Sequence, residues 1–180
     1  VAATQLLIKA KSAQSYQGDV DNMANSSRHY LQNGIVAIGE MMGRIRPYDS
    51  LKLFRDAVKA GFKPKSSIYY VYDEVAGNTH LQPTNDDQLR LKVFMDGSIS
   101  GETAYNQQPY PSGQNGVCLT DATKLKQAVT YAKQQHLQVA IHAMGDAAIQ
   151  LILDVTDKLQ PWLSARPSIR IEHASILSNQ

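Results

Sequence analysis

Short apolar runs alternate regularly with segments of helical periodicity, and this alternation constrains the fold more than any other feature of the sequence. Three of the apolar runs that suit a buried strand are followed by a connection and then by an amphipathic segment. These runs span residues 35–39, 67–72, 89–95, 137–142 and 168–173. Strands and helices that alternate with short connections are typical of parallel βαβ units, in either a doubly wound sheet or a barrel. The sequence therefore predicts an α/β fold with a parallel sheet.

The helical segments carry start and stop signals. A polar helix is expected to end at Asn33-Gly34, and Asp49 is expected to cap the next helix. Thr120 or Asp121 begins the clearest helix, in which apolar residues repeat at the spacing of one helix face. The predicted inner faces are Leu53, Phe54, Ala57 and Val58 in the second helix, Leu125, Ala128, Val129 and Ala132 in the third, and Ile149, Ile152 and Val155 in the fourth.

A long segment without periodicity separates the third apolar run from the clearest helix. Residues 101–116 are rich in Gly, Pro, Asn, Gln and Tyr. Loops of this length within a compact domain are usually functional or mobile. The sequence predicts such an irregular loop here.

Size, charge and cysteine content limit the classes of partner and compartment. The chain of 180 residues is expected to form one domain over residues 1–180, and its net charge of +2 gives no basis for a nucleic-acid or membrane partner. The single cysteine, Cys118, excludes an internal disulfide and fits a reducing compartment such as the cytoplasm. No apolar run approaches the roughly 18 residues that cross a bilayer.

Three polar residues occupy positions in or at the end of apolar runs. Lys92 lies inside the third run, while His142 and His173 each end a run and are separated by 31 residues (173 − 142), which matches one strand-helix-strand step. In a βα barrel the carboxyl ends of the strands form the rim where active sites lie. Two neutral imidazoles that converge there can bind a metal. The alternative is that both are structural core histidines.

Three carboxylates lie near these positions. Asp96 follows the third apolar run, and Asp146 stands at a helix start, where we interpret it as the N-cap. Glu172 precedes His173 and is expected on the opposite face of its strand, between the sheet and the helices. Arg170 shares that face, so we interpret Arg170 and Glu172 as a structural ion pair.

Three blocks of sequence resemble one family of hydrolases. The first block reads LKVFMDGSISG over residues 91–101, with TA at 103–104 and PY at 109–110. The second reads VAIHAMGD over residues 139–146, and the third reads RIEHA over residues 170–174. In order and spacing they are similar to the "KxFxDGS…TA…PY", "HAxGD" and "RIEHA" blocks of amidohydrolase family 3, and the resemblance covers nearly the whole chain.

The resemblance implies a metal-dependent hydrolase with a (β/α)8 TIM barrel, of which this chain would supply roughly strands 2–6. Enzymes of this family, which include proteins similar to N-substituted formamide deformylase, hydrolyse linear amides and other non-peptide carbon-nitrogen bonds with water activated by one or two divalent metals, usually zinc. The implied metal ligands and catalytic residues are His142 and His173, together with Lys92. The lysine can be carboxylated in such enzymes, which converts its ammonium into an anionic oxygen ligand.

Further residues of the matching blocks bear on the substrate. Asp96, Ser98 and Tyr110 lie in the first block and are predicted to bind a small-molecule amide substrate. Glu102 and Ala147 stand where the family commonly has arginine. Two positive charges are therefore missing near the expected substrate mouth.

Parts of the family's site are not found in this sequence. The strand-one HxH pair and the strand-eight Asp have no counterpart, because His29, His80 and His136 lie in a helix, a loop and a helix end. A complete barrel needs about 250 residues. We therefore expect the chain to be an internal segment of a catalytic barrel that is weakly active or inactive by itself. The alternative is a non-catalytic α/β assembly module that self-associates, for example as a homodimer through open barrel edges.

Overall fold

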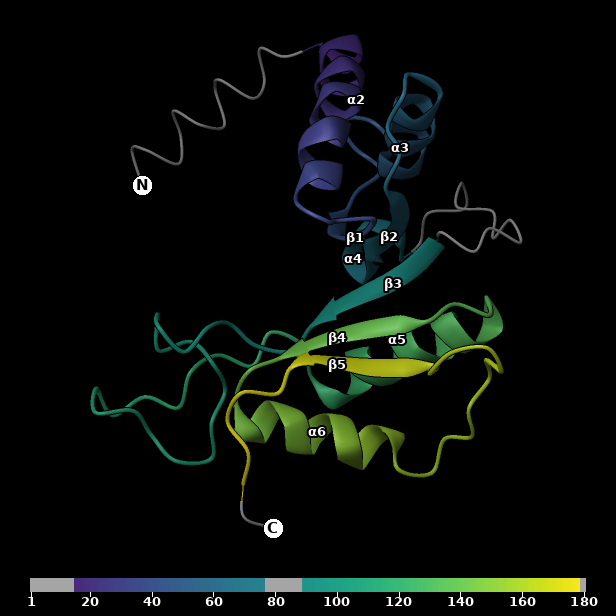
Figure 1. Ribbon diagram of the computed structural model, residues 1–180. Helices are drawn as coiled ribbons and strands as arrows, with labels where there is room; N and C mark the ends of the chain where they lie inside the picture. The colour runs from purple at the N-terminus through teal and green to yellow at the C-terminus, as the bar shows by residue number, and fades with distance from the viewer. Residues whose placement is uncertain (1–14, 77–88, 179–180) are drawn as a thin grey trace. The chain divides into compact units, whose positions relative to one another are not determined.

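The computed structural model describes residues 15–76 and 89–178 (Figure 1). The chain divides into two compact units, residues 1–68 and 69–180. Each unit is described by itself below. The prediction of one domain over residues 1–180 stays a prediction. The helical character expected before residue 15 and most of the polar loop after residue 76 lie outside the described residues.

The first unit contains two packed helices, α2 (Tyr16–Gln32) and α3 (Ser50–Lys59). The strand β1 (Ala37–Gly43) lies between them in the chain, and β2 (Lys65–Val71) begins at the end of the unit. As predicted, Asp49 caps α3, because its carboxylate accepts a hydrogen bond of 2.8 Å from the Lys52 backbone N–H. The predicted end of α2 at Asn33-Gly34 is also confirmed.

The face of α3 that packs inward differs by part of a turn from the predicted one. Leu51, Phe54 and Ala57 are buried, whereas Val58 is 48% exposed. Residues three apart stay on one side of a helix, while the residue after Ala57 lies about 100° further round. Phe54 stacks edge-on against Phe62, with ring centroids 6.2 Å apart.

The first strand differs from its prediction in both position and burial. The apolar run at residues 35–39 was expected to be a buried strand, but β1 starts at Ala37, and Ile35 and Val36 are 40% and 66% exposed. In the strand order β1-β2-β3-β4-β5, β1 is an edge strand. A strand with one neighbour has less cover than an interior strand, which accounts for the exposed side chains.

The second unit carries the regular βαβ pattern predicted from the sequence. Its strands β3, β4 and β5 pair in parallel, in the order in which they occur in the chain. Within the described residues, no helix is long and apolar enough to span a membrane. The remaining elements are α4 (Tyr72–Val75), β3 (Leu89–Phe94), α5 (Ala122–Gln134), β4 (Val139–Ala143), α6 (Asp146–Thr156) and β5 (Ile169–His173).

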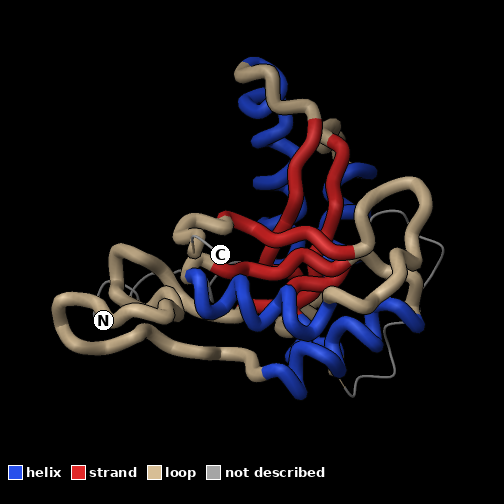
Figure 2. The backbone as a smooth tube through the Cα atoms, turned by 90° about the horizontal axis from the view of Figure 1, so that it is seen from below, coloured by secondary structure: helices blue, strands red, loops and turns tan. Residues whose placement is uncertain are grey.

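Helices α5 and α6 cover one face of β3, β4 and β5 (Figure 2). Leu89, Arg90 and Leu91 of β3 border a small cavity together with Tyr131 of α5. The buried apolar side chains of Leu89, Leu91 and Val93 alternate along the strand, so we assign the odd-numbered positions of β3 to the face that the helices cover. The even-numbered positions, which include Lys92, therefore line the other face. The four residues predicted as the inner face of α5 are all buried: Leu125, Ala128, Val129 and Ala132.

The register of the three strands sorts their residues into rows. In a parallel sheet, residues that are aligned across strands point to the same face. Lys92 aligns with Ala140 and, one strand further, with Arg170. The next even row consists of Phe94, His142 and Glu172. The face away from the helices therefore carries the polar side chains.

Candidate metal centre

His142 and His173 come together at the carboxyl ends of adjacent strands. Their ring centroids lie 4.7 Å apart, with the ring planes at 73°. His142 is largely buried, with 15% of its side chain exposed, and His173 is exposed. The structure thus places the two predicted ligands side by side, as the spacing of one strand-helix-strand step indicated.

The position of His173 depends on an unusual backbone conformation. By strand alternation it belongs to the row of Ala143, on the face opposite His142. Its φ is +74°, and that of Ala174 is +48°. These left-handed conformations end the regular strand at His173, which lets its ring meet the ring of His142. The pattern of residue types gave no signal for this turn.

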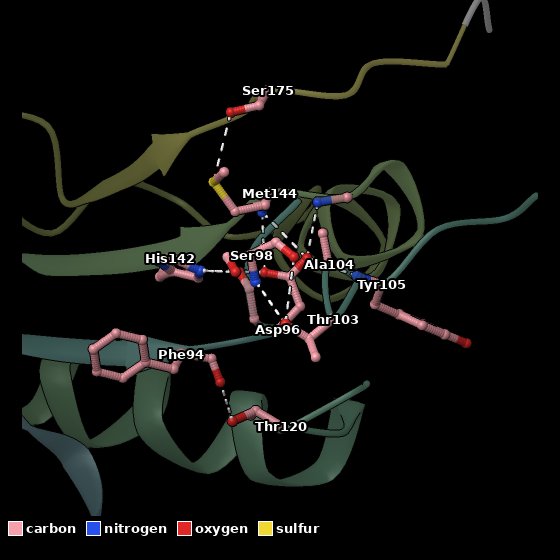
Figure 3. Close-up of polar contacts among 12 residues, drawn as sticks. Phe94, Asp96, Ser98, Thr103, Ala104, Tyr105, Thr120, His142, Met144 and Ser175 are labelled. Carbon is pink, nitrogen blue, oxygen red and sulfur yellow. Dashed lines mark hydrogen bonds and ion pairs between the residues drawn. The ribbon is translucent and has the colours of Figure 1, made fainter. Parts of the chain in front are cut away.

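The protonation of the His142 ring follows from its hydrogen bond to Gly97. The Nε2 atom of His142 lies 2.7 Å from the Gly97 carbonyl oxygen (Figure 3). Because a carbonyl can only accept a hydrogen bond, Nε2 carries the proton. In the neutral ring, Nδ1 is then the nitrogen with a free lone pair. A histidine that ligates a metal usually donates its other ring N–H in this way.

Asp96 is buried among backbone amides beside His142. Its carboxylate accepts hydrogen bonds from the backbone N–H groups of Tyr105 (2.9 Å), Met144 (3.0 Å) and Gly145 (2.8 Å) (Figure 3). The Asp96 side chain has no exposed surface, and its Oδ1 lies 3.5 Å from His142 Nε2. A residue predicted to bind substrate is therefore turned inward and holds two backbone segments, one at Tyr105 and one at Met144-Gly145.

Lys92 is buried on the same face of the sheet as His142. It is 3% exposed, and its ammonium lies 4.8 Å from the centre of the Phe94 ring. Burial lowers the pKa of Lys92 from 10.5 to about 8, while Glu172 acts to raise it and Arg170 to lower it. A lower pKa increases the fraction of neutral amine, which is the form that reacts with carbon dioxide to give a carbamate.

Arg170 and Glu172 form the predicted ion pair, but on the other face of the sheet. An Arg170 Nη2 donates to Glu172 Oε2 over 3.1 Å. Arg170 lies in the same row of the sheet as Lys92, and Glu172 lies in the row of His142. Both rows face away from the helices, so the ion pair does not lie between the sheet and the helices. The prediction was wrong because it placed His173 on the metal-site face by strand alternation, whereas His173 reaches that site through its left-handed backbone.

The long loop after β3 is held by its own backbone and by α6. Ser98 is exposed, and its backbone N–H donates to Thr103 Oγ1 over 2.9 Å. The Tyr110 hydroxyl donates to the Ala104 carbonyl over 3.2 Å. Within the described part of the chain, the hydrogen bonds of Ser98 and Tyr110 stay within residues 98–114 and do not join them to the histidines. The predicted irregular segment is confirmed.

Asp146 has a different role from the predicted N-cap. Gly145 is the N-cap of α6, and no side chain caps this helix. The Asp146 carboxylate instead accepts a hydrogen bond of 2.8 Å from the Gln107 N–H and so fastens the long loop to α6. Its charge still lies in the first turn of a helix, where a negative charge is favourable.

The described donors fit part of a zinc site. Imidazole nitrogen is a preferred zinc ligand, and structural or catalytic zinc takes three or four protein ligands. Residues 15–76 and 89–178 contain no group of three His, Cys, Asp or Glu side chains that could hold a metal. The two histidines therefore need further ligands, for which the neighbouring Lys92 qualifies only as a carbamate.

The fold matches that of metal-dependent hydrolases. A crystal structure of an uncharacterized metal-dependent hydrolase from Pyrococcus furiosus superposes with a TM-score of 0.75 at 24% identity, covering 96% of this chain and 36% of that one. A second, from Pyrococcus horikoshii OT3, gives a TM-score of 0.66 at 22% identity, covering 80% and 31%. These likenesses show the fold, which is part of an α/β barrel, as predicted.

Sequence comparison identifies the family. The sequence model of the amidohydrolase family (Amidohydro_3) matches residues 3–180, so the chain belongs to this family. YtcJ of Bacillus subtilis (strain 168), whose name describes it as an amidohydrolase, is 33% identical over 92 residues, which are 50% of this chain and 17% of YtcJ. Protein LONG AFTER FAR-RED 3 of Arabidopsis thaliana is 36% identical over 91 residues, 49% of this chain and 16% of that protein. The chain thus matches about a sixth of the length of these relatives.

Proposed function

We propose that this chain carries part of the active site of a hydrolase that cleaves the carbon-nitrogen bond of small linear amides with the help of a divalent metal. The family match supports a hydrolase of the amidohydrolase type. The observation that carries the proposal is the contact between His142 and His173 at the carboxyl ends of adjacent parallel strands. Active sites of βα barrels lie at this end.

Each of the three predicted ligands has a distinct part in the proposed site. His142 offers Nδ1, because Nε2 is engaged with Gly97, and His173 offers an exposed ring beside it. Lys92, as a carbamate, offers an oxygen from the same face of the sheet. We propose one or two zinc ions as the metal. When bound, zinc polarises a substrate carbonyl and lowers the pKa of water towards neutrality.

The substrate is proposed to meet the long loop after β3. Ser98 is exposed there, and the Tyr110 ring is partly exposed. Asp96 is less suited to direct contact, since its carboxylate is enclosed by backbone amides. Glu102 and Ala147 supply no positive charge that could pair with a substrate carboxylate. The proposed substrate is therefore an amide that carries no carboxylate group.

We further propose that the 180-residue chain has little hydrolytic activity by itself. It covers 36% of the Pyrococcus furiosus chain, and no strand-one histidine pair is found in its sequence. The cytoplasm is the proposed location, with neither nucleic acid nor a membrane as a partner. The proposals for the whole protein's substrate and activity rest on the family match and on the two histidines.

Zinc binding by the purified chain tests the proposal. Affinity is measured by competition with a chromophoric chelator, for the unaltered chain and for His142→Ala and His173→Ala. His29→Ala is the matched control, because His29 is an exposed histidine of α2 in the other unit. We expect zinc binding that both site variants lose and the control keeps. Binding that survives both site substitutions would contradict the proposed site.

Self-association is a second candidate, supported by apolar side chains around the edge strand β1. Val36 and Met42 are 66% and 45% exposed. Apolar side chains on a sheet edge favour pairing with another strand, and an edge lysine opposes it. We expect a homodimer in size-exclusion chromatography with light scattering, and a monomer for Met42→Lys. A monomeric unaltered chain would remove this candidate.

A further inference from the structure

The contacts of Asp96 join three backbone segments that surround His142. Asp96 follows β3, Tyr105 belongs to the long loop, and Met144 and Gly145 form the turn between β4 and α6. His142 lies two residues before Met144 and bonds to the carbonyl of Gly97, the residue after Asp96. One carboxylate therefore holds the turn that follows His142, and it belongs to the residue directly before Gly97, whose carbonyl accepts the hydrogen bond of the His142 ring.

The geometry of this cluster suits orientation rather than chemistry at the substrate. The Asp96 side chain has no exposed surface, so it offers no face to a substrate. Hydrogen bonds between a carboxylate and backbone N–H groups are stronger than those between neutral groups. The carboxylate also lies 3.5 Å from the protonated Nε2 of His142, which favours the tautomer with its proton on that nitrogen.

We propose that Asp96 is a positioning residue, which fixes the tautomer and direction of the His142 ring through the Gly97 carbonyl and the Met144-Gly145 turn. One consequence of this inference rests on the proposed function, namely that His142 presents Nδ1 to a metal. The tautomer itself is a property of the chain in the absence of any metal.

Asp96→Asn tests the proposal, because asparagine keeps the size of the side chain but replaces one acceptor oxygen by an NH2 donor that faces backbone donors. The readout is the 15N spectrum of the His142 ring, recorded without metal above the pKa of histidine. We expect protonated Nε2 in the unaltered chain and a mixture of tautomers in Asp96→Asn. Zinc affinity is expected to fall about 10- to 100-fold, as for other residues that orient a metal ligand.

Asp121→Asn is the matched control, since Asp121 also accepts a backbone hydrogen bond, of 2.8 Å from Lys124, but only caps α5. We expect it to change the free energy of unfolding by less than about 0.5 kcal/mol, because asparagine and aspartate are similarly good N-cap residues, and His142 to keep its tautomer. If Asp96→Asn behaved like this control, with an unchanged ring spectrum, Asp96 would be merely structural and the proposal would be overturned.

A measurement on the unaltered chain keeps the proposal testable if Asp96→Asn does not fold. A ring proton on Nδ1 instead of Nε2 would overturn it directly. Protonated Nε2, together with slow amide exchange at Tyr105, Met144 and Gly145, would support it. Failure to bind zinc with the expected tautomer present would count against the proposed function and leave the role of Asp96 intact.

Discussion

The rings of His142 and His173 lie 4.7 Å apart although strand alternation assigns the two residues to opposite faces of the sheet. The left-handed backbone at His173 and Ala174 reconciles these facts, because it turns the end of β5 towards β4. A hydrogen bond of 3.0 Å from the Ala174 N–H to the Ala143 carbonyl holds this turn. The candidate centre is thus built on a locally unfavourable conformation.

The first prediction concerns the cost of that conformation. A left-handed backbone costs a residue with a Cβ about 1–2 kcal/mol, and glycine adopts it freely. Ala174→Gly is therefore expected to leave the free energy of unfolding unchanged or to raise it by up to about 1 kcal/mol. Urea denaturation measures this. Ala140→Gly, at a position buried inside β4, is expected to lower the free energy of unfolding by about 1 kcal/mol. Equal losses at the two sites would contradict the strained turn.

A second prediction concerns Gly145, against which the long loop packs. A Cβ at this position would lie 2.0 Å from the Tyr105 carbonyl oxygen. Gly145→Ala is expected to lower the free energy of unfolding by about 1–3 kcal/mol, the usual cost of overpacking. It should also weaken zinc binding, because the Gly145 N–H is held by Asp96.

Gly18→Ala in α2 is the control for Gly145→Ala. A Cβ at Gly18 would meet only the Ser15 hydroxyl oxygen, at 3.2 Å, and alanine favours helices. We expect a change in the free energy of unfolding within about 0.5 kcal/mol and unchanged zinc affinity. A Gly145→Ala chain as stable as this control would show that the loop does not pack there.

The sequence predicted the parallel βαβ pattern and the meeting of His142 with His173, because both follow from apolar periodicity and from spacing along the chain. It did not predict the left-handed turn at His173, which any residue type can be forced to adopt by its neighbours. The partners of Asp96 and of the His142 ring are backbone amides and a carbonyl, and every residue has these groups. Such contacts leave no pattern in the sequence, although a carboxylate directly after a strand was a partial signal.

A third prediction concerns the pH dependence of stability. The pKa of Lys92 is lowered to about 8 in the folded chain from 10.5, so the unfolded chain binds more protons between these values. The free energy of unfolding of the metal-free chain should therefore rise from pH 8 to pH 10.5 through this residue. Lys92→Met is expected to remove this rise and to stabilise the chain at neutral pH, where a buried ammonium is replaced by an apolar side chain of similar size.

The comparison for Lys92→Met is Lys126→Met on the exposed side of α5. Urea denaturation at several pH values between 7 and 10.5, covering the window set by Lys92, gives the difference between each variant and the unaltered chain. Lys126→Met should follow the unaltered chain throughout. The same pH profile for both variants would show that Lys92 titrates as an exposed lysine.

The last prediction uses the ion pair beside Lys92. Glu172 raises and Arg170 lowers the pKa of this lysine. Glu172→Gln is therefore expected to lower the pKa of Lys92 below about 8, and Arg170→Gln to raise it above that value. Side-chain 13C NMR of Lys92 as a function of pH measures both shifts in the metal-free chain. Opposite signs are the essential outcome, because loss of packing alone would move both pKa values in the same direction. Shifts of equal sign would show that Lys92 lies outside the field of this ion pair. They would also contradict the assignment of Lys92, Arg170 and Glu172 to one face of the sheet.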